Sequence, residues 1–346
     1  MRKLTILILV VFLTTSQASA LQIPPPAAPD SVSDMIPAEP ETFAQGLWQL
    51  VKAVISRLRP DLTEACGVCL SVIAASLLTG LLESMTGKGK KISELICTLS
   101  MGTILLRPAK SFISLGVRTV EEMTAYGKLL LPVMTAGLSA QGGITKSAAL
   151  YTGTAVFNTI LSGLVSAVLI PMVYIFLALS IANSAVGEQA LKKIRDLIKW
   201  CATWVLKGGL YIFTGYMSLT GVITGSADAA ALKVTKTTIS TIVPVIGGIL
   251  TEASETVLVG AGIVKNAAGV YGLLAILALC LEPFARIGLH FLLLKATGAV
   301  CAVVATKQAT ELVDDFSAAM GMLVAVIGSI CLMLLISIVC FMKGVG

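Results

Sequence analysis

The sequence contains few ionisable and few aromatic residues. Charged residues make up 13% of the 346 positions and aromatic residues 5%, whereas an average soluble domain is roughly 25% charged. Hydrophobic residues account for 56%, and the mean hydropathy is +0.93. This composition leaves no room for a large soluble domain and predicts an all-α, polytopic helical membrane protein. At roughly 20 apolar residues per span, the chain accommodates about six to eight transmembrane helices.

The scarcity of histidine and the placing of cysteine exclude several common sites. His290 is the only histidine, so there is no HExxH zinc motif, and there is no GxxxxGK[ST] phosphate-binding loop. Cys66 and Cys69 form a CxxC pair in an apolar segment, where no second pair completes a metal site and small-residue packing is the better interpretation. We therefore expect no enzyme activity, metal or cofactor. The net charge of +6 suits the basic loops of a membrane protein and does not indicate nucleic-acid binding.

The first twenty residues have the three parts of a secretory signal peptide. Arg2 and Lys3 precede a short apolar run at residues 4–13, and Ala18-Ser19-Ala20 forms an A-x-A cleavage site. We expect residues 1–20 to be cleaved, with an uncleaved anchor as the alternative. The mature N-terminus would then start outside the cytoplasm.

Two further segments precede the membrane domain. Residues 21–41 hold six prolines and only acidic charges, which predicts an extended, semi-rigid, extracytoplasmic linker. Residues 42–60 have apolar positions at helical spacing and predict an amphipathic helix that ends at Pro60. This helix either lies in the membrane interface, with Trp48 near the headgroups, or packs on the protein's own surface. The remaining residues, 61–346, form the predicted polytopic membrane domain.

Two basic clusters determine the expected topology. They lie at residues 88–91 and 192–199, and the positive-inside rule places both in the cytoplasm. An even number of crossings must then separate them, one within 95–115 and one within 150–182. Residues 129–146 would lie outside, or form a re-entrant segment.

The chain also contains a possible internal repeat with an offset of 112 residues. The aligned pairs are Pro132 with Pro244 and Pro171 with Pro283, each with apolar neighbours that also coincide. Two structural halves, 128–225 and 240–343, would follow, and paired repeats with interrupted helices are typical of transporters. Chance coincidence among so many apolar residues is the alternative.

Five ionisable residues form a candidate polar path. Glu282, Arg286 and His290 are spaced i, i+4, i+8 along one side of a helix, and Glu252 and Glu255 share a face upstream. The row could relay protons or ions. Alternatively, Glu282 and Arg286 neutralise one another inside the bundle while His290 bonds to a carbonyl, and we favour this interpretation because an unpaired charge at membrane depth is costly. The two upstream glutamates could attract a cation, form a neutral carboxyl pair or lie at a wet outer surface, and we favour the last.

The stretch 215–272 is apolar enough to lie in a bilayer, yet it is rich in small, polar and ionisable residues. A passive lipid-facing anchor would not carry such residues. We expect a discontinuous or re-entrant helix near 244–248, where irregular backbone must be buried in protein or line a cavity. The candidate helix-packing and docking residues are Gly215, Gly221, Gly225, Asp228, Pro244, Gly247 and Gly248.

Several runs in this stretch are distinctive. They are GYMSLTGVITGSADAAALKVTK from Gly215, VPVIGGILTEASETVL from Val243 and KNAAGVYGLLAIL from Lys265. Together with the signal peptide, the run LLLPVMTAGLSA from Leu129 and the apolar C-terminal span, they resemble the stage III sporulation protein AE family of endospore-forming bacteria. The resemblance covers nearly the whole chain and supplies no catalytic residues.

The resemblance implies a subunit of the channel that joins mother cell and forespore. Such a subunit would lie in the mother-cell membrane as a multi-pass protein. Its partners would be a secretion-type ATPase, ring-forming proteins and a forespore membrane protein, in addition to the lipid bilayer. Two functions therefore follow: a non-enzymatic export-gate or scaffold subunit, or a stand-alone secondary transporter with a polar path through the repeat interface.

Overall fold

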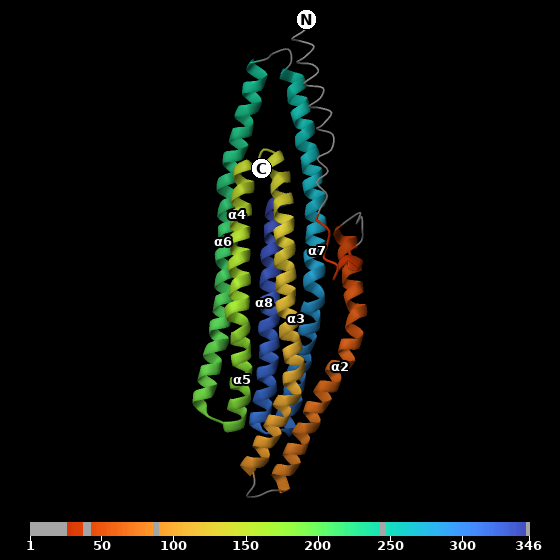
Figure 1. The fold of residues 1–346 in the computed structure, drawn as a ribbon, viewed down its shortest axis with the longest axis vertical. Helices are drawn as coiled ribbons and strands as arrows, with labels where there is room; N and C mark the ends of the chain where they lie inside the picture. Colours follow the sequence, from red (N-terminus) through yellow and green to blue (C-terminus); the bar gives the residue numbers. More distant parts are fainter. Residues whose placement is uncertain (1–25, 37–42, 86–89, 243–246, 344–346) are drawn as a thin grey trace.

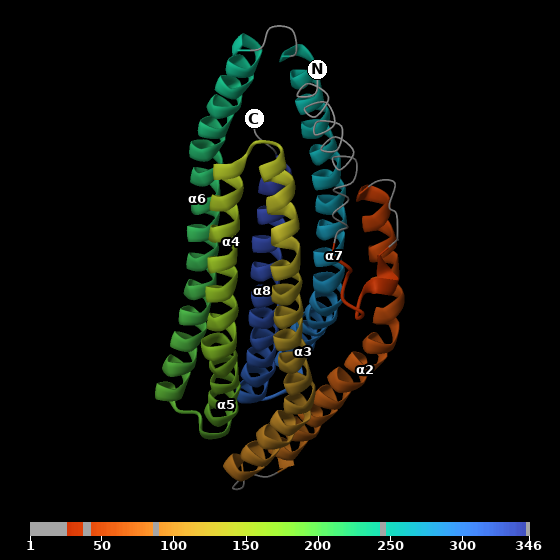
Figure 2. The ribbon, with the colours of Figure 1, turned by 45° about the horizontal axis from the view of Figure 1, so that its top comes forward.

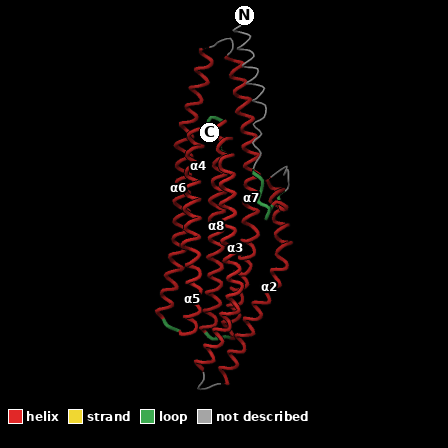
Figure 3. The backbone as a smooth tube through the Cα atoms, in the orientation of Figure 1, coloured by secondary structure: helices red, strands yellow, loops and turns green. Residues whose placement is uncertain are grey.

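The computed structural model describes residues 26–36, 43–85, 90–242 and 247–343, with side chains described throughout except at positions 79, 82–94, 221–266 and 304. Within these ranges the protein is helical and contains no strand (Figure 3). The all-α prediction is therefore confirmed.

In the part of the chain that the structure describes, six long helical passes run antiparallel to their neighbours in sequence (Figure 1). A short 3-10 helix, η2 (Ser33–Met35), precedes them. The passes are α2 (Phe43–Met85), α3 (Lys90–Ala140), α4 (Ile144–Leu164) joined through the π-helical turn η3 (Val165–Leu169) to α5 (Ile170–Val186), α6 (Gln189–Ile242), α7 (Gly247–Val304) and α8 (Lys307–Met342).

Local sequence explains where the helices end. Gly142, between α3 and α4, and Gly187, after α5, have φ values of 87° and 76°, a left-handed conformation that glycine adopts at no steric cost. At the start of α8, the Thr306 side chain accepts a hydrogen bond from the backbone N–H of Ala309 at 3.3 Å. This is the N-cap arrangement that satisfies a free N–H group of the first turn.

Helix α8 is the centre of the bundle. Its side chains are buried along nearly the whole length, among them Phe316, Leu323, Ile327 and Phe341. Helices α3, α4, α5, α6 and α7 all contact it, and α2 lies outside, against α3 and α7 (Figures 1 and 2). The apolar C-terminal run therefore forms the core of the bundle.

In the described part of the chain, four helical stretches are long and apolar enough to cross a membrane. They are Phe43–Leu78, Ile144–Val186, Ala267–Val303 and Lys307–Met342. These spans support a membrane protein, whereas the expected six to eight spans are not confirmed, because α3 and α6 carry more charge. Each stretch has at least 36 residues, or about 54 Å of helix at 1.5 Å per residue, against a hydrocarbon core of about 30 Å. The helices are thus longer than the membrane is thick.

The predicted helix end at Pro60 is wrong. Helix α2 continues through this proline to Met85, and Pro108, Pro132 and Pro283 also lie inside helices. Proline removes one N–H group, which weakens an isolated helix, but tertiary packing against neighbouring helices offsets that loss. Residues 43–60 are consequently the first part of a long helix, not a separate amphipathic one, and residue 42 lies outside the described residues.

The segment 26–36 packs against the bundle, which differs from the extended linker that its prolines predict. Ala28, Val32, Met35 and Ile36 are all buried. These apolar residues lie between the prolines and acidic residues, and their burial removes hydrocarbon from water. The signal peptide and the rest of the linker lie outside the described residues.

The turns place the described parts of both basic clusters at one end of the bundle, namely Lys90 and Lys91 at the start of α3 and residues 192–199 near the start of α6. The end of α2, the start of α3 and the α5–α6 turn lie at the lower end of Figure 1, and the α3–α4 turn lies toward the opposite end. Two passes therefore separate the clusters, as the parity argument requires. Which end faces the cytoplasm stays a prediction.

The two 112-residue repeats are not confirmed. This offset maps the α3–α4 turn at 141–143 onto 253–255, which lie inside α7. The re-entrant segment expected near 244–248 falls largely on positions 243–246, outside the described residues, between the end of α6 at Ile242 and the start of α7 at Gly247.

Candidate functional site

Helices α2 and α7 run parallel and in register. Gly46 lies so close to Leu274 that a Cβ atom at position 46 would be 2.6 Å from Leu274 Cδ1. Further along both helices, Ser76 Oγ lies 3.3 Å from Cys301 Sγ. The partners differ by 228 and 225 positions, so the register is kept over about thirty residues. Because α2 and α7 are distant in sequence, side-chain contacts must determine their register. Charged residues on the two helices provide these contacts.

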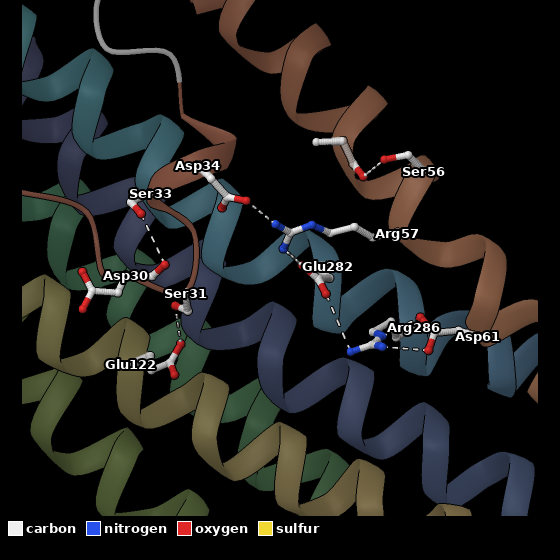
Figure 4. Close-up of polar contacts among 11 residues, drawn as sticks. Asp30, Ser31, Ser33, Asp34, Ser56, Arg57, Asp61, Glu122, Glu282 and Arg286 are labelled. Atoms are coloured by element: carbon white, nitrogen blue, oxygen red, sulfur yellow. Dashed lines mark hydrogen bonds and ion pairs between the residues drawn. The ribbon is translucent and has the colours of Figure 1, made fainter.

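A network of five charged side chains joins the two helices midway along this contact (Figure 4). Arg57 donates to Glu282 Oε2 at 2.9 Å and to Asp34 Oδ2 at 2.6 Å. Arg286 binds Asp61 with two hydrogen bonds, from Nε at 2.6 Å and from a terminal nitrogen at 2.7 Å. Glu282 also lies 3.6 Å from Arg286 on its own helix. Each carboxylate is therefore bound to at least one guanidinium group.

The order of the charges explains the register. Arg57 and Asp61 are one turn apart on α2, and Glu282 and Arg286 are one turn apart on α7 with the signs reversed. Parallel packing then sets each positive group opposite a negative one, and a shift by one turn would bring like charges together. The bidentate Asp61–Arg286 pair adds geometric specificity because the planar guanidinium matches the carboxylate.

The sequence favours an ion pair between Glu282 and Arg286 within one helix, whereas the closest partners of both residues lie on α2. That pair is present at 3.6 Å, but the shorter bonds of both residues go to α2. Arg57 and Asp61 were not among the sequence-derived site residues. The signal that could have found them is the i, i+4 pair of opposite sign order on each helix.

His290 does not continue this network. Each i+4 step rotates a side chain by about 40°, so His290 is turned about 80° from Glu282. Its buried ring packs on Phe112 of α3, with 4.3 Å between ring centroids, and it borders a small apolar cavity that Phe316 and Met320 of α8 also line. This aromatic contact takes the place of the expected carbonyl bond in the described contacts.

The N-terminal segment is attached to the same region. Asp34 lies beside Arg57, and Ser31 donates to Glu122 of α3 at 3.1 Å (Figure 4). These contacts bind residues 26–36 to both α2 and α3. The ion network therefore joins two helices and also holds the segment that precedes them.

A second ionic cluster lies near the α5–α6 turn and joins α6 to α8. Arg195, only 7% exposed in its side chain, donates to Asp315 of α8 and lies 3.0 Å from Asp196. Lys192 and Glu311 pair beside it at 3.0 Å. The basic residues belong to the segment predicted to be cytoplasmic, and Asp196 is adjacent to Arg195. The acidic partners on α8, Glu311 and Asp315, lie about 120 positions away and were not among the candidate residues.

The other candidate residues are only partly described. Gly215 faces open space on α6, since a Cβ atom there would meet no atom within 4 Å. Pro244 lies outside the described residues. The remaining positions lie in helical backbone whose side chains are not described: Gly221, Gly225, Asp228, Gly247, Gly248, Glu252 and Glu255.

The chemistry of the described site is that of ion pairing. In the ranges that the structure describes, no group of three or more His, Cys, Asp or Glu residues is placed to hold a metal ion. The five charges of the α2–α7 network are two arginines and three carboxylates, all engaged with one another. Such an arrangement stabilises a helix interface, because each charge has a close counter-charge.

Comparison with known proteins gives the family. The family model described as stage III sporulation protein AE matches residues 31–344, nearly the whole chain. The chain belongs to this family. Within the family, a curated relative in Bacillus subtilis (strain 168), named stage III sporulation protein AE, is 24% identical over 200 residues. This match covers 57% of the chain and 50% of the relative, so the chain spans about half the length of the curated relative that it matches.

No solved structure matches the chain. As a member of the stage III sporulation protein AE family, the protein has a role in sporulation, and its four apolar helical stretches support a membrane location. The resemblance inferred from the runs at Gly215, Val243 and Lys265 is thereby confirmed.

Proposed function

We propose that the protein is a non-enzymatic export-gate or scaffold subunit of the multiprotein channel that links mother cell and forespore. Family membership over residues 31–344 is the observation that carries this proposal. The proposed location is the mother-cell membrane, with the protein facing the forespore. The proposed partners are an ATPase, ring-forming proteins and a forespore membrane protein.

The shape of the bundle supports a role in assembly. The C-terminal part of α6, which ends at Ile242, and the N-terminal part of α7, which begins at Gly247, extend beyond the α3–α4 turn as two helical arms (Figures 1 and 2). The distinctive runs at residues 226–231 and 253–257 lie in these arms. We assign the arms to contact with partner subunits, since they project from the helices that form the common core.

The ion network favours a scaffold over a stand-alone transporter. A transporter's polar path needs groups that bind and release an ion or a proton. Glu282 and Asp61 are instead bound by arginines at 2.9 Å or less, between two helices that these pairs hold together. The geometry of these ion pairs suits a permanent contact between α2 and α7.

Affinity capture from crosslinked sporulating cells tests the proposal. The tagged protein should retain an ATPase, ring subunits and a forespore membrane protein in stoichiometric amounts. Asp228→Lys, in an arm, should reduce this recovery, whereas Lys128→Glu, at an exposed position of α3, should not. Recovery of the protein alone would contradict the proposal, as would ion flux through vesicles that contain only this protein.

A further inference from the structure

A groove of about 310 Å³ lies on one side of the bundle, between α6 and α8. Its walls come from α6 and from one aromatic residue of α7, and its floor comes from α8. The residues that the argument uses are Lys199, Leu206, Lys207, Phe291, Gly321 and Ala325.

The floor of the groove is formed by small residues. Ala325 is exposed on α8, although most of that helix is buried. At Gly321, one turn earlier, a Cβ atom would lie 3.2 Å from Phe291 Cε2, so glycine lets the aromatic ring lie close over α8. Leu206, 5% exposed, closes the side toward α6. The floor is thus recessed and apolar, and it suits a hydrocarbon chain.

The rim of the groove is positively charged. Lys199 and Lys207 are both exposed, and neither forms an ion pair within the described part of the chain. They are two turns apart on α6, about 12 Å along the helix. No acidic residue lines the groove. An occupant with a negatively charged head would therefore be favoured at this rim.

Two tryptophans place the rim at a membrane surface. Trp200 and Trp204 lie on α6 beside the lysines, 59% and 64% exposed, with ring centroids 6.2 Å apart. Exposed tryptophan together with lysine is typical of the headgroup level of a bilayer. The apolar floor on α8 belongs to a stretch able to cross the membrane. The groove thus combines a positively charged rim, flanked by tryptophan, with an apolar floor.

The charge of the groove selects its occupant. Among the described residues, two unpaired lysines and no acidic residue line it, above an apolar floor, and this combination complements a molecule with a negatively charged head and a hydrocarbon chain. We propose that the groove binds an anionic phospholipid, with the phosphate between Lys199 and Lys207 and an acyl chain on Gly321 and Ala325. Basic pockets between membrane helices recognise anionic headgroups in this way.

Native mass spectrometry of the full-length protein in detergent tests this site, with dioleoyl phosphatidylglycerol and dioleoyl phosphatidylcholine as probes. The protein should retain phosphatidylglycerol preferentially. The double variant Lys199→Gln/Lys207→Gln should lower its affinity roughly thirtyfold, the effect of two basic residues beside an anionic membrane surface. The control Lys110→Gln/Lys128→Gln removes two exposed lysines of α3 and should have no effect.

Three further measurements separate the contribution of the lysine charge from that of the apolar floor. Lys199→Arg/Lys207→Arg should retain phosphatidylglycerol, because the positive charge is kept. Ala325→Leu should lower the lipid affinity, because the larger side chain occupies the floor of the groove while both lysines are unchanged. Inorganic phosphate at the same concentration should not displace the lipid. Equal retention of both lipids, full binding by the glutamine variant, or displacement by phosphate would overturn the proposal. If the glutamine variant does not fold, Ala325→Leu decides, since its side chain is exposed and need not disturb the core.

Discussion

Asp61 is the residue on which the α2–α7 joint most depends. It accepts two short hydrogen bonds from Arg286, whose next carboxylate, Glu282, lies at 3.6 Å. Arg57, in contrast, has two carboxylate partners below 3 Å. Removal of the Asp61 charge therefore leaves Arg286 poorly neutralised in a partly buried position, which costs more than the loss of an exposed pair.

Asp61→Asn should lower the free energy of unfolding by about 1–3 kcal/mol, less than for a fully buried pair because Arg286 is one-third exposed. Reversible unfolding in sodium dodecyl sulfate, followed by circular dichroism, measures this change. Arg118→Gln breaks an exposed i, i+4 pair with Glu122 and should cost only about 0.3–0.5 kcal/mol.

The double variant Asp61→Asn/Arg286→Gln adds a second test. It should lose less stability than the two single changes added together, since no unpaired charge remains. Equal effects of Asp61→Asn and Arg118→Gln would show that the network does not hold the two helices together.

At the scale of helices, the contact between α4 and α6 depends on one glycine. Tyr216 of α6 lies over Gly153 and donates a hydrogen bond to the carbonyl of Ala149 at 3.0 Å. A Cβ atom at position 153 would lie 2.0 Å from the Tyr216 ring. The ring cannot approach α4 in this way beside any larger residue.

Gly153→Ala should therefore destabilise the protein by about 1–3 kcal/mol, the usual cost of an overpacked contact. Gly163 lies on the same helix with no atom within 4 Å of its would-be Cβ. Gly163→Ala should be neutral or stabilise by roughly 0.5–1 kcal/mol, because alanine favours the helix over glycine. Thermal unfolding of both variants gives the comparison, and equal melting temperatures would contradict the placing of α4 against α6.

The positions of the helices could be predicted from the sequence better than the contacts between them. Apolar composition correctly predicts an all-α protein, and the glycines at 142 and 187 lie where helices end. Pro60 misleads, because its local preference to end a helix is weaker than the packing of α2 on α7. The i, i+4 sign order on α2 and α7 marks Arg57 and Asp61 as candidates for pairing. It does not show which helices meet, because the partners of these residues lie 225 positions away, and Arg195 is 120 positions from Asp315.

For the whole molecule, the antiparallel order of the passes predicts sidedness. The turns at Gly187 and Thr306 should lie on one side of the membrane and the turn at Gly142 on the other (Figure 1). Reporter domains inserted at these three turns measure their location. The basic cluster at 192–199 predicts that Gly187 is cytoplasmic. A reporter at Gly142 on the same side as one at Gly187 would contradict the six-pass order.

Helix α7 is the longest element of the molecule. Its 58 residues extend about 87 Å, nearly three times the thickness of a hydrocarbon core of about 30 Å. One end forms an arm, the middle is bound to α2, and the other end leads into the turn before α8. The helix is thus one continuous element, and a displacement of the arm reaches the opposite end of the bundle without passing through a loop.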